Sequence, residues 1–121
     1  MNIPKIFDVE YRFCLLLWEH EPINSTKLVA ICKERLGWSK ATTYTVIRRL
    51  AERGVLKNEN ATVVSLVSRE QVQQAQLQEM IKKTFDGSIP SFIAAFSSSQ
   101  QLSDEDIHQL EELIKNYRRS L

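Results

Sequence analysis

Residues 38–56 read WSKATTYTVIRRLAERGVL, and the expected architecture is built around this stretch. Ser39 is a typical N-cap residue. Gly54 is a typical residue just beyond a helix end, because it has no Cβ and enters the left-handed region at little cost. The sequence therefore predicts a helix from Ser39 to Arg53. One stripe at helical spacing should face a core, and it consists of Thr43, Val46, Ile47 and Leu50.

Basic residues are concentrated in and around this predicted helix. Residues 33–57 hold seven basic and two acidic side chains, whereas the whole chain of 121 residues has a net charge of +1. A basic block in an otherwise slightly acidic chain is typical of a surface that binds a polyanion such as DNA. On charge alone, a basic helix face that is merely solvated remains the alternative.

Helical patterns precede this stretch and β-prone residues follow it. A first helix is predicted over residues 8–20, with Asp8 as its cap, and a second ends at Gly37. Residues 55–57 and 62–66 are β-prone, and the polar residues 58–60 between them predict a turn. Three helices followed by a hairpin is the order of a winged helix-turn-helix, and we expect that domain over residues 1–67.

The remainder, residues 68–121, is expected to be a helical dimerisation domain, so that the fold class is mainly α. Helical patterns run from Ser68 to Phe85, over residues 89–96 and onward from Ser103, and residues 97–101 are polar and expected to be exposed. The last helix has an apolar seam at 3-4-3-4 spacing, which predicts a partner helix. Folding back onto the winged domain is the alternative. The expected dimer contacts are Leu77, Ile81, Phe85, Phe92, Ile107, Leu110, Ile114 and Tyr117.

Other classes of protein are disfavoured. No apolar run approaches the roughly 18 residues that span a bilayer, and no signal peptide is recognisable, so we expect a cytoplasmic protein. Cys14 and Cys32 lie in helical patterns and are expected to be reduced core thiols. His20 and His108 are isolated, and no catalytic motif is present. We therefore expect no enzyme, metal, cofactor or small-molecule substrate.

Several segments, which together span nearly the whole chain, carry a resemblance to a known family. They are the pattern Trp38-Ser39-x-x-Thr42-x-x-Thr45-x-x-x-Arg49-Leu50-x-x-x-Gly54-Val55-Leu56, the helix end Leu16-Leu17-Trp18, the segment Ser65-Leu66-Val67 and residues 102–107. They resemble the BlaI/MecI/CopY-type family of penicillinase and methicillin-resistance repressors. The third-helix pattern is the most specific of these segments.

The resemblance implies a homodimer with N-terminal winged helices and a helical C-terminal dimerisation domain. Members repress β-lactamase or related operons. They are inactivated by cleavage between two C-terminal helices, triggered by a membrane sensor-protease system. The family's cleavage position falls at Ala95-Phe96, where penicillinase-type members usually have Asn before the Phe. Copper-responsive relatives carry a cysteine-rich tail, and this chain has no cysteine after Cys32.

The helix face opposite the apolar stripe is expected to read a double-stranded DNA operator. Arg48 is suited to form two hydrogen bonds with the edge of a guanine. Ala41 or the methyl group of Thr45 is suited to apolar contact with the methyl group of a thymine. Thr42 could instead bond within its helix, and Arg49 could form an internal salt bridge. The expected base contacts are Lys40, Ala41, Tyr44, Thr45 and Arg48, and the expected phosphate contacts are Ser39, Thr42, Arg49 and Lys57.

The function expected from these features is that of a DNA-binding transcriptional repressor. It would act as a homodimer on a palindromic operator, since two recognition helices at fixed spacing contact twice as many base pairs as one. The alternative is a winged-helix module that contacts proteins and has no sequence-specific DNA binding.

Overall fold

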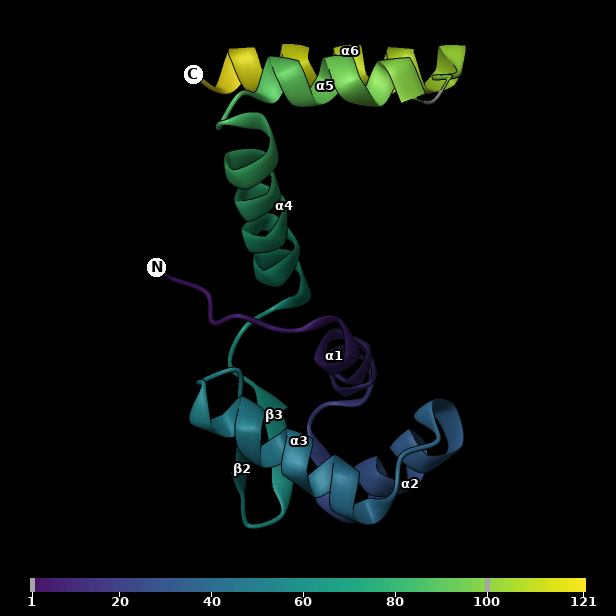
Figure 1. Cartoon of the computed structure of the whole chain (residues 1–121), viewed down its shortest axis with the longest axis vertical. Helices are drawn as coiled ribbons and strands as arrows, with labels where there is room; N and C mark the ends of the chain where they lie inside the picture. Colours follow the sequence, from purple (N-terminus) through teal and green to yellow (C-terminus); the bar gives the residue numbers. More distant parts are fainter. Residues whose placement is uncertain (1, 100) are drawn as a thin grey trace. The chain divides into compact units, whose positions relative to one another are not determined.

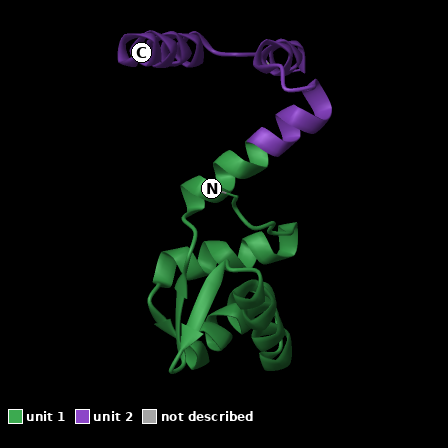
Figure 2. Cartoon of the chain, turned by 90° about the vertical axis from the view of Figure 1, so that its left-hand side faces the viewer, with its two compact units in different colours: residues 1–77 green, residues 78–121 purple. Residues whose placement is uncertain are grey.

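The computed structural model describes residues 2–99 and 101–121 and shows a mainly helical chain with a small antiparallel sheet. The chain divides into two compact units, residues 1–77 and 78–121 (Figure 2). The division falls inside α4 (Arg69–Phe85), because Val72 at the start of that helix is buried in the core of the first unit. The first turns of α4 therefore belong structurally to the first unit, ten residues beyond the boundary expected at residue 67.

The first unit has the predicted order of three helices followed by a hairpin, which confirms the winged-helix fold (Figure 1). The helices and the sheet bury apolar side chains in one core, and the largest fully buried side chains include Phe13, Leu17, Leu28, Leu50 and Val63. The elements are α1 (Asp8–His20), α2 (Ser25–Leu36), α3 (Lys40–Glu52), β2 (Leu56–Glu59) and β3 (Thr62–Ser65).

Side-chain caps fix the helix ends in this unit. Asn24 accepts the N–H of Thr26 at 2.8 Å at the start of α2, and Gly37 ends that helix with a φ of 71°. Ser39 caps α3, as predicted, by accepting the N–H of Thr42 at 3.1 Å. The cap of α1 is Phe7 rather than Asp8, because the carboxylate of Glu10 reaches back to the N–H of Phe7 at 3.0 Å.

The hairpin turn lies later in the chain than predicted. Asn58 and Glu59, which were expected in the turn, pair with β3 as part of β2. The turn is Asn60–Ala61, and both residues have positive φ, 51° and 61°. Two successive residues with positive φ match the twist of a two-residue hairpin turn, which explains the shift. Lys57 and Glu59 therefore lie on the same face of β2.

A short strand was missed by the sequence pattern. β1 (Ile23–Asn24) pairs antiparallel with β3, with Ile23 opposite Val63 and Asn24 opposite Thr62, so that the sheet order is β1-β3-β2. Two residues are too few to show alternation in a sequence. The strand exists because the chain between α1 and α2 passes along the free edge of β3.

The second unit contains the end of α4, α5 (Ile89–Ser99) and α6 (Asp104–Ser120). Phe85 and Phe92 form an edge-to-face contact of 5.7 Å between ring centroids, and Ser103 and Asp106 form a capping box at the start of α6. Ser97–Ser99 were expected outside a helix, but they extend α5. Their hydroxyls donate to carbonyls three or four residues back, which satisfies these groups inside the helix. Gln100, from the same expected stretch, lies outside the described residues.

Candidate nucleic-acid interface

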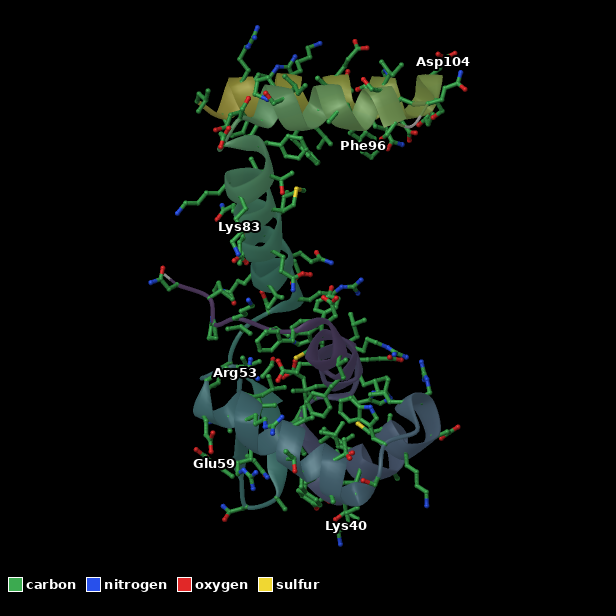
Figure 3. All side chains as sticks on the ribbon, viewed as in Figure 1. Lys40, Arg53, Glu59, Lys83, Phe96 and Asp104 are labelled. Carbon is green, nitrogen blue, oxygen red and sulfur yellow. The ribbon has the colours of Figure 1, made fainter. Side chains whose placement is uncertain are left out.

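The third helix separates its side chains into a buried and an exposed side. Thr43, Val46, Ile47 and Leu50 are buried, as the apolar stripe predicted. On the other side, the expected contact residues at positions 40, 41, 42, 48 and 49 are all exposed. Lys40 points away from the body of the first unit in Figure 3. The helix therefore presents a polar, basic face that no other element of its unit covers.

Two of the expected base contacts are less accessible than the others. Thr45 is half-buried, and so is Tyr44, whose ring packs against the core. The hydroxyl of Tyr44 lies 3.3 Å from Oγ of Ser25, the first residue of α2. Tyr44 therefore has an internal hydrogen-bond partner. No local sequence signal links these two residues, which are nineteen positions apart.

The hydroxyls at the start of α3 contact each other. Oγ of Ser39 accepts the N–H of Thr42 and donates to Oγ1 of Thr42 at 3.0 Å. Local bonding, which was the alternative for Thr42, is thus present. A threonine hydroxyl that accepts one hydrogen bond still has its own hydrogen to donate. The Thr42 hydroxyl can therefore still reach an oxygen outside the protein.

The remaining expected phosphate contacts carry charge. Arg49 is exposed and forms no ion pair within residues 2–99 and 101–121, so the internal salt bridge considered for it is not formed there. Lys57 lies on β2, and its Nζ is 3.8 Å from a carboxylate oxygen of Glu59. Glu59, labelled in Figure 3, lies on the hairpin. An acidic neighbour at the proposed wing contact was not expected from the sequence.

Arg53 belongs to the basic block in the sequence, but its side chain is bound within the protein. Its guanidinium pairs with the carboxylate of Glu10, donates to the carbonyl of Lys5 at 2.9 Å and lies 5.4 Å from the ring centroid of Phe7. Burial alone would raise the pKa of Glu10. The hydrogen bonds from Arg53 and the Phe7 N–H, with the charges of Arg53 and Arg49, outweigh that burial and leave the pKa below its ordinary value. Arg53 thus ties the N-terminal segment to α3.

The two cysteines lie in the core of the first unit and are not bonded to each other. Burial raises the pKa of the Cys14 thiol to about 12, with a further contribution from the charge of Glu10. Burial also raises the pKa of Cys32 to about 11, although a hydrogen bond with Thr43 opposes the shift. Both thiols are therefore protonated at neutral pH. The described residues contain no group of side chains suited to hold a metal ion.

The expected cleavage position lies in the second unit. Ala95 and Phe96 are both within α5, and both are exposed. Proteases cut exposed, irregular chain most readily, so cleavage here requires local unwinding of the helix. Among the described residues, no helix is long and apolar enough to cross a membrane.

Comparison with known protein families shows to which family this chain belongs. The sequence profile of the penicillinase repressor family matches residues 7–116. The chain belongs to the penicillinase repressor family. Members of this family are transcriptional repressors.

Two relatives illustrate how far the similarity extends. The penicillinase repressor of Bacillus licheniformis is 22% identical over 121 residues, which cover 97% of this chain and 94% of the relative. The methicillin resistance regulatory protein MecI of Staphylococcus aureus strain Mu50 is 21% identical over 114 residues, which cover 91% and 93% of the two chains. The family similarity thus includes both units of this chain.

Solved structures match the winged-helix part. The solution structure of the DNA-binding domain of the repressor BlaI has a TM-score of 0.51 and 26% identity, over 58% of this chain and 90% of that chain. The monomeric form of Bacillus licheniformis BlaI in complex with the blaP half-operator has a TM-score of 0.51 and 24% identity, with the same coverage. These matches show that the winged-helix part of this chain shares its fold with BlaI.

Proposed function

We propose that this repressor binds a palindromic double-stranded operator as a homodimer, with α3 of each protomer in the major groove. The observation that carries the proposal is the uncovered face of α3, where Lys40, Ala41 and Arg48 lie opposite the buried side. A helix fits the major groove, in which each base pair presents a distinct pattern of donors and acceptors. The fold shared with BlaI, which has been solved with a half-operator, supports this docking.

The side chains on this face suit different parts of the groove. Arg48 can donate two hydrogen bonds to one guanine. The ammonium group of Lys40 carries a compact charge and can donate a hydrogen bond to an acceptor on a base edge. Ala41 and the methyl group of Thr45 offer apolar contacts to a thymine methyl. These groups lie on one face because their positions follow the helical repeat. Sequence preference would therefore come from α3.

Phosphate contacts would surround this face. Ser39 and Thr42 lie at the N-terminus of α3, where free backbone N–H groups and the helix dipole favour a negative charge. Arg49 extends the basic surface along the helix, and Lys57 lies on the hairpin. These contacts would position the protein on the duplex and contribute little to base preference.

The dimer would form through the second unit. Ile107, Leu110, Ile114 and Tyr117 are all exposed on α6, although they repeat at the spacing of a helix-pairing seam. A stable interface buries about 800 Å² per protomer, and large exposed apolar surfaces mark such interfaces. Leu77, Ile81, Phe85 and Phe92 would extend the contact onto α4 and α5.

Relief of repression would follow from cleavage at Ala95-Phe96 by a membrane sensor-protease system, as the family resemblance implies. A cut in α5 separates α6, with its apolar seam, from the winged-helix unit. The freed winged helix could then bind only one half-site. Its affinity for the whole operator would fall, because the linked second contact is lost.

The test is to select duplexes from a randomised pool with the full chain and to measure its mass by sedimentation. We expect a dimer that enriches inverted half-sites separated by about one helical turn, 10–10.5 base pairs, or a multiple. Arg48→Ala should relax the enriched sequence, whereas the control Arg12→Ala, an exposed arginine on α1, should not. A monomer, or a pool without enrichment, would overturn the proposal and favour a module that binds proteins.

A further inference from the structure

Ser25 joins three parts of the winged-helix unit. It is the first residue of α2, and only 4% of it is exposed. Its backbone N–H donates to the carbonyl of Ala61 in the hairpin turn at 2.8 Å. Its Oγ lies 3.3 Å from the hydroxyl of Tyr44 on α3. One buried residue therefore bonds to the hairpin turn and to the helix of the proposed interface.

The bond to the turn holds a strained conformation. Ala61 has a φ of 61°, a region that costs a residue with a Cβ about 1 kcal/mol. The hydrogen bond from Ser25 continues the pairing of β1 with β3 and helps to fix that carbonyl. The backbone of Ser25 thus supports the position of the hairpin turn.

The bond to Tyr44 restrains the N-terminal half of α3. Burial of Val46 and Leu50 is favourable but non-directional, whereas a hydrogen bond has a preferred distance and direction. Base recognition needs such precision, because the pairing of side chains with base edges depends on geometry. The residues nearest to Tyr44 on α3 include Lys40, Ala41 and Arg48, each three or four positions away.

We infer that Ser25 is a positioning residue for operator recognition, which holds Tyr44 and so sets the orientation of the exposed face of α3. The inference rests on the proposed function. It also assigns a role to Tyr44: its hydroxyl is engaged by Ser25, and its half-buried ring packs against the core, so that both parts hold α3 in place. Tyr44 would then act by orienting α3, and base selection would come from its exposed neighbours on that helix.

Two small changes isolate this bond. Ser25→Ala removes Oγ and keeps the backbone N–H that reaches Ala61. Tyr44→Phe removes only the hydroxyl. We expect each change to weaken binding to the duplex selected by the wild-type chain by about 2- to 10-fold, the value of one hydrogen bond. Binding to a scrambled duplex of equal length should not change, because phosphate contacts dominate it.

The experiment compares the full-length wild type, the two single variants and the double variant on the selected and the scrambled duplex, with melting temperatures. Because both changes remove the same bond, the double variant should lose no more selectivity than either single variant. Tyr11→Phe is the matched control, since Tyr11 is a half-buried tyrosine of α1 with a ring contact to Trp18. It should leave selectivity unchanged.

Three results would overturn the inference. The first is a further loss of selectivity when Tyr44→Phe is added to Ser25→Ala, since the hydroxyl would then contact DNA directly. The second is unchanged selectivity in both single variants. The third is an equal loss on both duplexes that parallels a lower melting temperature, which indicates stability alone. A wild-type chain that selects no duplex would instead overturn the proposed function, and this inference with it.

Discussion

The indole N–H of Trp18 donates a hydrogen bond of 3.0 Å to the carbonyl of Val67, which lies between the hairpin and α4. Trp18 also makes an edge-to-face contact with Tyr11, with 5.8 Å between the ring centroids. The bond fixes the point at which the chain leaves the hairpin, next to the domain boundary expected from the sequence. Together with the buried Val72, it anchors the start of α4 to the winged-helix core.

Replacing Trp18 by Phe should destabilise the first unit by about 1–2 kcal/mol, because the Val67 carbonyl loses its partner while an aromatic ring remains. Urea unfolding monitored by circular dichroism measures the change. Trp38→Phe is the control, since the Trp38 ring stacks on Phe13 at 6.0 Å and its indole makes no hydrogen bond to the described residues. An equal loss in both variants would show that ring size, and not the bond, is responsible.

The pair of Glu10 and Arg53 should make stability depend on pH. The folded pKa of Glu10 lies below the ordinary value of 4.5, so the pair stabilises the fold above that pH and its contribution is lost as the pH falls through the folded pKa. Glu10→Gln should lower stability by about 2 kcal/mol at pH 7 and flatten the decline between about pH 5 and 3. Thermal melting over that range tests this. Glu19→Gln, an exposed position of α1, should retain the wild-type slope.

Substitutions at Arg48 and Lys57 should separate base from phosphate contacts. Arg48→Ala should cost about 1–3 kcal/mol on the preferred operator and relax the choice of base at one position. Lys57→Ala should weaken binding to all duplexes alike. It should also reduce the slope of log affinity against log salt concentration by about one, the value of one phosphate contact. Gel shifts at several salt concentrations give both quantities. The reverse pattern would contradict the assignment.

Glu59 should limit the affinity of the hairpin for DNA. Its carboxylate competes with phosphate for Lys57, from which it is 3.8 Å away. Glu59→Gln should therefore tighten binding to every duplex, by about 2- to 3-fold at low salt and less at high salt. Glu70→Gln makes the same charge change at an exposed position of α4. If both variants gain equally, net charge explains the effect and the pair with Lys57 does not.

The serines after the expected cleavage position should weaken α5. Serine forms helices less well than alanine, by about 0.5 kcal/mol per residue. Replacing Ser97, Ser98 and Ser99 together by Ala should slow cleavage of the Ala95-Phe96 bond by thermolysin about 10-fold, because the cut requires local unwinding. Ser91→Ala, an exposed position in the first turn of α5, is the control. Unchanged cleavage of the triple variant would contradict a requirement for unwinding.

The sequence by itself determined the helices and the exposed face of α3. Local rules act within a few residues, and the Ser39 cap, the Gly54 stop and the apolar stripe from Thr43 to Leu50 all lie within one short stretch. The order of three helices and a hairpin followed from the same kind of signal. The basic block around α3 was also visible, because charge is counted without knowing any contact.

Only the tertiary structure decided which groups remain free to act. Arg53 is paired with Glu10 and the Tyr44 hydroxyl meets Ser25, although neither pair is close in sequence. Lys57 has Glu59 beside it because the hairpin turn lies at Asn60–Ala61, and β1 exists because another strand passes alongside it. Contacts between distant residues depend on how whole elements pack, and no local pattern of side chains encodes that packing.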